Sequence, residues 1–374
     1  MLEWKTIEEI AKRNKGIPIT AGQMSELDAP DGNVRVFAAG QTVANINESE
    51  LPSNCAYKEP SIIVKSRGYV DFVFYDKPFT HKNEMWSYSF VNKQFGKYVY
   101  YFLTTKTEFF RKKAKANSVK LPQLCVADTD KFLIPIPSQS EQNKIVDILD
   151  TFTSSIVNLK EQIALRRKQY EYYRDQLLDL EGKEGVEMKT ISEVAKNYTG
   201  LTYKPENVSD EGVLVLRSSN IDEDKLSFDN NVYVQMVIPE RAIVKENDIL
   251  ICVRNGSKRL VGKAAVINKE AEGMAFGAFM TILRSTGINY KFLFYAWQSE
   301  KVKAQYKGDE AMPIAQITSK DFKKIVIPVP TLAEQQRIVS ILDTFEASIQ
   351  NLEEQLSQRE KQYEYYRNKL LTFE

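Results

Sequence analysis

The sequence lacks the features of a membrane-spanning or secreted protein. No stretch approaches the roughly 18 consecutive apolar residues of a membrane span, and the first residues show no basic region followed by an apolar run. The three cysteines, Cys55, Cys125 and Cys252, are widely spaced and cannot all pair, which argues against an oxidising compartment and against Cys-x-x-Cys metal sites. We therefore expect a cytoplasmic protein with no membrane contact and no structural zinc.

Residues and motifs that carry catalysis are equally scarce. His81 is the only histidine, which excludes paired-His metal sites, and a lone histidine is more often a surface or a hydrogen-bonded core residue than part of a catalytic site. The sequence has no Gly-rich cofactor loop and no Gly-x-x-x-x-Gly-Lys-Ser/Thr string. Residues 76–79 read Asp-Lys-Pro-Phe, with Lys where an amino-methyltransferase needs its first Pro, and no acidic-x-Lys nuclease triplet follows Pro30-Asp31 within the next fifty residues. We predict no catalytic residue, no bound metal and no cofactor held by this chain.

What the chain does have is a tandem repeat. Its 374 residues, 43% of them hydrophobic, are enough for two or three folded domains. Residues 134–178 align without gaps on 327–371, with 28 of 45 positions identical, and residues 3–16 align on 187–200 with 8 of 14 identical. Each half therefore reads as a variable domain followed by a shared segment.

The shared segment has the seam of a coiled coil. Apolar residues step by four and three from Ile145 to Leu180, and again from Ile338 to Phe373, without Pro or Gly. About 40 residues at 1.5 Å each predict a helix about 60 Å long. Arg166 and Arg359 occupy the same polar seam position, either as buried charges that fix register or as side chains that extend to solvent. Residues that could dock a partner protein on these helices are Tyr172, Arg174, Tyr365 and Arg367.

The variable regions read as β-rich α+β domains. Short β-like runs at 61–65, 69–74, 212–216 and 248–253 are separated by Gly, Asn, Asp and Pro. Each domain has one amphipathic helix candidate, from Gly96 to Ala116 and from Tyr290 to Tyr306. An apolar strand ending in alternating prolines precedes each long helix, and the helices open at Ser140-Glu141-Gln142 and, with capping-box spacing, at Thr331.

Positive charge collects in the variable regions. They carry formal charges of +4 (1–137) and +2 (187–330), whereas the helical segments carry −2 and −3. Basic clusters suit phosphate contacts, while Arg, Asn and Ser can also read base edges; a solvated charged face is the alternative. The candidate DNA-binding residues are Lys65, Ser66, Arg67, Arg111, Lys112, Lys113, Arg217, Arg254, Asn255, Ser257, Lys258 and Arg259.

The repeated motif closely resembles the specificity subunit of type I restriction-modification systems. The match rests on Ile-Pro-Ile-Pro…Glu-Gln…Ile-Val at 134–146 and Ile-Pro-Val-Pro…Glu-Gln…Ile-Val at 327–339. The segment from Asp248 to Gly256 looks like the family's Asp-Ile-Leu…Arg-x-Gly turn. The first domain departs from it, because residues 61–68 lack the Asp and have a shorter turn.

The resemblance implies a DNA reader that is not itself an enzyme. Two target recognition domains (1–137 and 185–330) would each read half of a bipartite double-stranded DNA site. Two long antiparallel helices (138–184 and 331–374) would separate them in an α+β fold with pseudo-two-fold symmetry. These helices would also dock two adenine-methyltransferase subunits that bind S-adenosylmethionine, and restriction subunits would join the complex.

Two other functions remain compatible with the residues themselves. The near-zero net charge of +1 permits a coiled-coil adaptor that binds only proteins, and a DNA enzyme with an unrecognised site is the third alternative. The target bases cannot be read from the sequence, because pocket geometry decides them.

Overall fold

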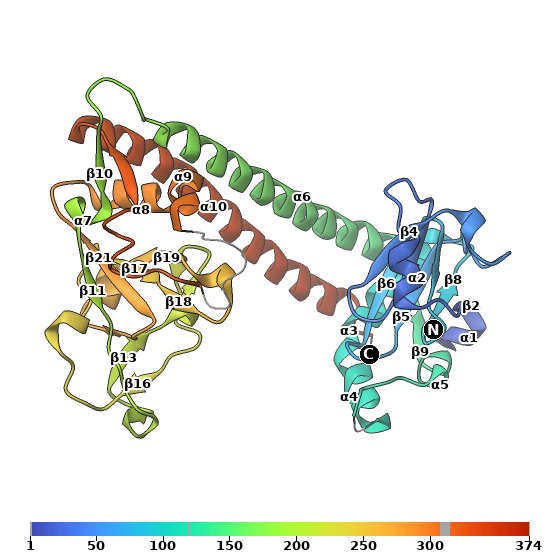
Figure 1. The fold of residues 1–374 in the computed structure, drawn as a ribbon. Coiled ribbons are helices and arrows are strands. Elements are labelled where there is room, and N and C mark those ends of the chain that lie inside the picture. The colour runs from blue at the N-terminus through green and yellow to red at the C-terminus, as the bar shows by residue number, and fades with distance from the viewer. Residues whose placement is uncertain (1, 119, 307–314, 374) are drawn as a thin grey trace. The chain divides into compact units, whose positions relative to one another are not determined.

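The computed structural model describes residues 2–118, 120–306 and 315–373. The chain forms two compact units, one of Met1–Lys160 with Glu354–Glu374 and the other of Glu161–Glu353. The long helices α6 (Gln139–Leu178) and α10 (Leu332–Leu370) each contribute one end to either unit. Each unit therefore combines a β-rich region with a pair of helix ends (Figure 1).

The main sheet of the first unit has four antiparallel strands. Their order is β2 (Lys12–Lys15), β8 (Trp86–Ser89), β5 (Ser61–Lys65) and β6 (Asp71–Tyr75). The strands expected at 61–65 and 69–74 are thus present, the second beginning at Asp71. All five residues of β5 are buried, as expected for a central strand that is covered on both faces.

A smaller sheet and several helices complete this unit. Strand β3 (Val34–Phe37) pairs antiparallel with β4 (Val43–Ile46) and parallel with β7 (Phe79–His81). The helix expected from Gly96 to Ala116 is instead two helices that meet at Lys106. Three threonines around that residue donate side-chain hydrogen bonds to backbone carbonyls one turn back, which competes with a regular helix. The helices are α1 (Ile7–Ile10), α2 (Ala21–Glu26), α3 (Lys93–Thr105), α4 (Thr107–Asn117) and α5 (Val126–Asp130).

The second unit repeats this plan. Its main sheet has the order β11 (Ala195–Thr199), β21 (Met280–Ser285), β17 (Ile249–Cys252) and β19 (Ala264–Val266). In the smaller sheet β13 (Val213–Leu216) pairs parallel with β20 (Ala275–Phe276), as β3 does with β7. The other elements are α7 (Ile191–Val194), β12 (Val208–Ser209), β14 (Ile221–Asp222), β15 (Lys225–Leu226) and β16 (Tyr233–Val234).

The second helix candidate is also split in two. It forms α8 (Tyr290–Gln298) and α9 (Glu300–Tyr306), which meet at Ser299. The Ser299 hydroxyl donates to the carbonyl of Ala296 at 2.7 Å and accepts from the amide of Val302 at 3.4 Å. It therefore serves the ends of both helices, as serine does at a cap.

The repeated motif residues attach each long helix to its β-rich region. A proline-containing strand precedes each helix: β9 (Leu133–Ile136) pairs with β1 (Glu3–Thr6), and β23 (Val326–Val329) pairs with β10 (Glu187–Thr190). The buried amide of Gln142 donates to the carbonyl of Pro137 at 2.8 Å, and Gln335 does the same to Pro330 at 2.8 Å. The side-chain cap of α6 is Ser138, whose hydroxyl bonds Glu141 at 2.8 Å, two residues before the expected Ser140. Thr331 caps α10 as predicted, accepting from the amide of Glu334 at 3.3 Å.

An aspartate of each long helix binds the helix that follows the main sheet. Asp150 of α6 accepts a hydrogen bond from the hydroxyl of Tyr101 at 2.7 Å and pairs with Lys97, both on α3. Burial and this carboxylate raise the pKa of Tyr101. The same arrangement connects α10 to α8, where Asp343 accepts from the hydroxyl of Tyr295 at 2.6 Å and from the ammonium group of Lys291 at 2.7 Å. We call each of these contact sets an aspartate joint.

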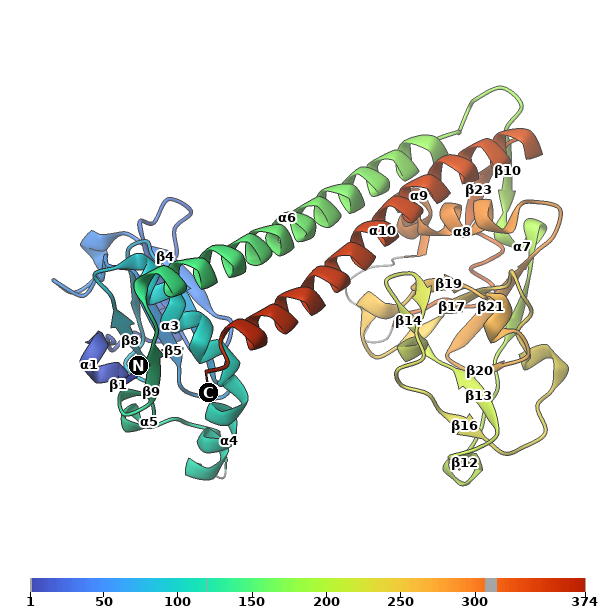
Figure 2. The same ribbon diagram turned by 180° about the vertical axis from the view of Figure 1, so that it is seen from behind.

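The two long helices lie side by side and antiparallel in both units (Figures 1 and 2). Phe152 of α6 stacks on Tyr366 of α10, with ring centres 5.4 Å apart, and the repeat-related pair Tyr173 and Phe345 has the same separation of 5.4 Å. Early residues of one helix thus meet late residues of the other, which confirms the predicted antiparallel pairing. Arg359 is only partly buried, with its guanidinium 5.7 Å above the Phe152 ring, so it is not a buried charge of the seam.

Candidate nucleic-acid interface

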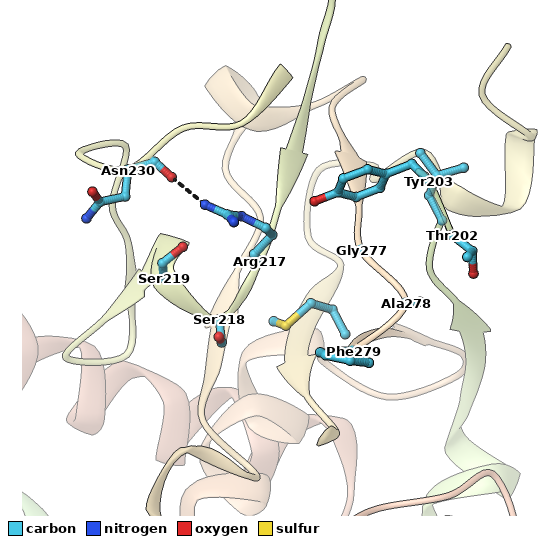
Figure 3. A pocket seen from close by; sticks show the side chains of 11 residues that line it. Thr202, Tyr203, Arg217, Ser218, Ser219, Asn230, Gly277, Ala278 and Phe279 are labelled. Atoms are coloured by element: carbon cyan, nitrogen blue, oxygen red, sulfur yellow. Dashed lines mark hydrogen bonds between the residues drawn. The ribbon is translucent and has the colours of Figure 1, made fainter. Parts of the chain in front are cut away.

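The second unit contains a cavity of about 720 Å³ beside its smaller sheet. Four segments line it: the one after β11, the one after β13, the one between β15 and β16, and the turn between β20 and β21 (Figure 3). Its polar lining includes Arg217 and Tyr203, and its apolar lining includes Phe279. It thus offers hydrogen-bond donors and aromatic surface together, as pockets for planar polar ligands do.

A glycine lets two of these segments approach each other. A Cβ atom at Gly200 would lie 2.1 Å from the carbonyl oxygen of Gly277. No residue with a side chain fits at that distance. The amide of Leu201 donates to Phe276 at 2.7 Å, and that of Gly277 donates to Leu216 at 2.9 Å. Backbone packing at the cavity therefore requires glycine at position 200, the last residue of the shorter repeat.

Arg217 has an incompletely satisfied guanidinium in this wall. Its Nη2 donates to the backbone carbonyl of Asn230 at 3.2 Å (Figure 3). Its Nε is buried and has no hydrogen-bond partner among the residues that the structure describes. A buried donor without a partner costs free energy, so Arg217 is suited to bind an acceptor on a ligand that enters the cavity.

The predicted basic turn borders the same cavity. Arg254, in β18 (Arg254–Asn255), lies with its guanidinium 5.3 Å above the ring of Phe279. The amide of Asn255 donates to the hydroxyl of Ser218 at 3.2 Å and its Oδ1 accepts from the backbone of Ser257 at 2.9 Å. Asn255 therefore ties the turn to the cavity wall. The side chains of Arg254, Ser257, Lys258 and Arg259 are exposed, so the structure brings this predicted group together with Arg217.

Asp248, at the start of this motif, has a structural role. It is buried and accepts from Arg284 at 2.7 and 2.8 Å and from the amide of Lys245 at 2.7 Å. The ion pair raises the pKa of Arg284. The aspartate thus stabilises the start of β17 (Ile249–Cys252), the strand that leads into the turn with Arg254. Its side chain is not exposed to solvent.

In the first unit, two of the predicted DNA-binding residues lie inside the fold. Lys65 is 8% exposed and donates to the carbonyl of Gly40, while Ser66 is fully buried and donates to the carbonyl of Glu84 at 2.6 Å. Burial also lowers the pKa of Lys65. The expectation that both face DNA does not fit these positions, because they end a strand that is covered on both faces. Arg67, the next residue, is exposed.

The basic cluster on α4 is largely engaged in local contacts. The Nε of Arg111 donates to the carbonyl of Val70 at 3.1 Å, and its guanidinium lies 4.1 Å above the ring of Tyr69. Lys113 pairs with Asp128 at 3.1 Å. Lys112 is exposed, so of the three predicted residues it is the one most open to a ligand.

Of the predicted partner-binding residues, three are accessible and one is not. Tyr172 and Tyr365 are 61% and 59% exposed, and Arg367 is partly exposed. Arg174 is only 4% exposed and pairs with Asp175 at 3.1 Å. The expectation that Arg174 docks a partner does not fit, because the helix face carrying it is covered within the second unit.

The only histidine of the sequence lies in the core of the first unit. His81 is fully buried, with Nδ1 3.2 Å from the carbonyl of Lys82 and Nε2 3.2 Å from the hydroxyl of Ser87. It is therefore the hydrogen-bonded core histidine that was the more ordinary expectation. Within the described ranges, no group of three potential metal ligands occurs and no helix is long and apolar enough to cross a membrane.

Sequence reasoning missed the aromatic part of the cavity. Tyr203 and Phe279 were not among the predicted residues, although Phe279 is 57% exposed. The signal that could have indicated it is the Gly-Ala-Phe string at 277–279, which lies between two apolar runs. The glycine there predicts a turn, and a phenylalanine in a turn is a candidate for an exposed aromatic side chain.

The chain resembles known proteins over its full length. Residues 1–166 and 183–360 match the family model described as the type I restriction modification DNA specificity domain. The specificity subunit of the Escherichia coli type I restriction enzyme EcoR124I/EcoR124II is 31% identical, over 100% of this chain and 94% of that protein. The specificity subunit of the Methanocaldococcus jannaschii enzyme MjaVIII is 24% identical, over 74% of this chain and 69% of its relative.

Solved structures agree on the fold. The S subunit of a type I restriction-modification system from M. genitalium has a TM-score of 0.61 at 17% identity, covering 100% of this chain and 97% of that one. A chain from a structural study of type I complex assembly has a TM-score of 0.58 at 16% identity, covering 99% and 97%. These matches confirm the α+β class with two β-rich regions and two packed helices. The chain therefore belongs to the type I restriction-modification DNA specificity family, as the non-catalytic subunit that confers DNA specificity.

Proposed function

We propose that each β-rich region reads one half of a bipartite double-stranded DNA target. The observation that carries this proposal is the edge of the cavity in the second unit, where Arg217, Arg254 and Phe279 meet beside exposed basic side chains. The guanidinium of an arginine forms paired hydrogen bonds with the major-groove edge of guanine, and lysines bind DNA phosphates. The residues proposed to contact DNA are Arg67, Lys112, Arg217, Arg254, Ser257, Lys258 and Arg259, with Asn255 positioning the turn.

The test is selection of duplexes by the assembled complex. The chain would be purified with its methyltransferase partner and incubated with a random duplex library, and the retained duplexes would be sequenced. Enrichment of two short blocks at a fixed separation supports the proposal. Retention of no DNA, with the methyltransferase still bound, would favour the alternative of a protein-binding adaptor.

We also propose that the helices dock two methyltransferase subunits, which supply S-adenosylmethionine, and that restriction subunits join this complex. The supporting feature is a duplicated pair of adjacent, exposed tyrosines, one pair on each helix. Tyr172 and Tyr173 have ring centres 5.3 Å apart, and Tyr365 and Tyr366 lie 5.2 Å apart. All four are at least 41% exposed, and exposed tyrosines are typical anchors of protein interfaces.

Native mass spectrometry tests this docking. The wild-type chain should carry two methyltransferase subunits, Tyr172→Ser or Tyr365→Ser one, and the double variant none. Gln358→Ala, an exposed change elsewhere on α10, is the control and should retain two. Two subunits on the double variant would show that these tyrosines are not the docking sites.

A further inference from the structure

The turn that follows the central strand of each main sheet places an arginine opposite a glutamine. In the second unit, β18 pairs antiparallel with β22 (Ala315–Gln316), so that Arg254 faces Gln316. In the first unit an isolated antiparallel bridge joins Arg67 to Gln123. We propose that Gln123 and Gln316 are base-reading residues, each acting beside its arginine at one half of the DNA target. This inference rests on the proposed DNA-reading function.

Backbone hydrogen bonds show that the two positions are equivalent. The amide of Leu124 donates to the carbonyl of Ser66 at 2.8 Å, and the amide of Ile317 donates to that of Val253, also at 2.8 Å. In both units the acceptor directly precedes the arginine and the donor directly follows the glutamine. The shorter turn of the first domain therefore does not displace Arg67, which occupies the place of Arg254.

The geometry directs both side chains of each pair to one face. Residues directly opposite in an antiparallel pair have Cβ atoms about 5 Å apart and point to the same side. Arg67, Gln123, Arg254 and Gln316 are all exposed. Among the described residues, no hydrogen bond engages the side-chain amide of either glutamine.

The chemistry of such a pair suits base edges better than phosphates. A guanidinium donates two parallel hydrogen bonds to guanine, and a glutamine amide both donates and accepts, as adenine requires. The amide is uncharged, so it can discriminate bases without adding to the salt dependence of binding. An arginine beside a glutamine can therefore read two neighbouring base pairs.

The surroundings of the shared pair differ between the domains, which would let them read different sequences. The carbonyl of Phe279 accepts from the amide of Val253 at 2.9 Å, and the carbonyl of Glu84 accepts from the hydroxyl of Ser66 at 2.6 Å. The same backbone position thus carries an aromatic ring in the second domain and a carboxylate in the first. That carboxylate pairs with Lys82 at 3.3 Å.

Binding measurements on the complex with the methyltransferase test the inference. The probes are the selected duplex and every single base-pair change within its two read blocks. Gln316→Ala should lose roughly tenfold to a hundredfold of discrimination at one or two adjacent positions of one block, the scale of a bidentate contact. Gln123→Ala should do so in the other block. Neither variant should change how steeply affinity falls with salt concentration. The control Gln358→Ala should leave both affinity and base discrimination unchanged.

The variant Gln316→Glu distinguishes a change of base preference from a general loss of binding. A carboxylate accepts from cytosine and repels adenine N7, so this variant should change the preferred base and not only weaken binding. Unaltered discrimination in both alanine variants, or an equal loss for all duplexes, would overturn the inference. If the wild-type complex selects no sequence at all, the proposed function itself fails, and that outcome is distinct.

Discussion

At the scale of single residues, the same side-chain types have opposite roles according to burial. Arg254 lies exposed over an aromatic ring, whereas Arg284 is held by the buried Asp248 at 2.7 Å. Lys258 is exposed in the basic turn, whereas the ammonium group of Lys65 donates a hydrogen bond to a backbone carbonyl. The sequence showed basic residues near the strand ends, but it could not show which of them the sheet would cover.

Arg254 and Lys258 should differ in how their loss weakens binding. If Arg254 pairs with a guanine, Arg254→Ala should cost about 1–3 kcal/mol at one base position only. Lys258→Ala should lower affinity for all duplexes and reduce the salt slope by about one charge, as loss of a phosphate contact does. Titrations at several salt concentrations would separate the two effects, and identical behaviour of both variants would refute the assignment.

His81 should make the stability of the first unit depend on pH. Burial lowers its pKa from 6.5 to about 4, so the unfolded chain binds a proton more readily between these values. Stability from this group is therefore complete above pH 6.5 and falls as the pH drops toward 4, by about 2 kcal/mol at pH 5.

Urea unfolding of the wild type and His81→Gln from pH 7.5 to 4.5 measures this effect. Carboxylates titrate in both proteins, so the difference between the two curves isolates the histidine. The wild type should lose more stability than the variant below pH 6.5. Parallel curves would contradict the assignment of a buried neutral imidazole.

At the scale of elements, the repeated motif is explained by attachment of the helices. The Glu-Gln string provides a capping carboxylate and a buried amide, and the aspartate of Ile-Leu-Asp binds a tyrosine and a lysine of the neighbouring helix. The periodicity predicted both long helices and the seam between them, whereas their antiparallel direction was an expectation that the resemblance implied. It could not predict the breaks at Lys106 and Ser299, because local side-chain hydrogen bonds, not amphipathicity, end those helices.

Removal of the aspartate joint should destabilise the second unit. Asp343→Ala removes the carboxylate that accepts from the hydroxyl of Tyr295 at 2.6 Å and pairs with Lys291 at 2.7 Å, a loss that costs about 1–3 kcal/mol. Glu364→Ala, an exposed change on the same helix, should stay within about 0.5 kcal/mol of the wild type. Chemical denaturation compares them, and an equal effect of the two changes would show that the joint is not important for stability.

At the scale of the whole molecule, helix length is proposed to set the separation of the two DNA blocks. The observed contacts place Lys160 against Glu360 at 2.9 Å and Arg167 against Glu353 at 2.5 Å. A seven-residue insertion after Gln162 and another after Leu356 would therefore face each other and leave the seam in register on both sides. Each adds about 10 Å of helix, close to three base-pair steps, with a rotation of only about 20°.

The insertion should lengthen the unread gap by about three base pairs while each block keeps its sequence. Selection from the random library, with wild type and double insertion in parallel, measures the gap directly. An unchanged gap with an intact complex would show that the helices do not set the spacing.

We propose that two separate domains of this chain read two blocks of its DNA target, and mapping of methylated bases distinguishes this arrangement from a single contiguous target. The chain and its methyltransferase would be expressed together in a host without type I systems, and modified bases mapped genome-wide. We expect one motif of two blocks around a fixed gap, which depends on this chain and is altered in a single block by Arg254→Ala. A contiguous motif, or methylation that persists without this chain, would contradict it.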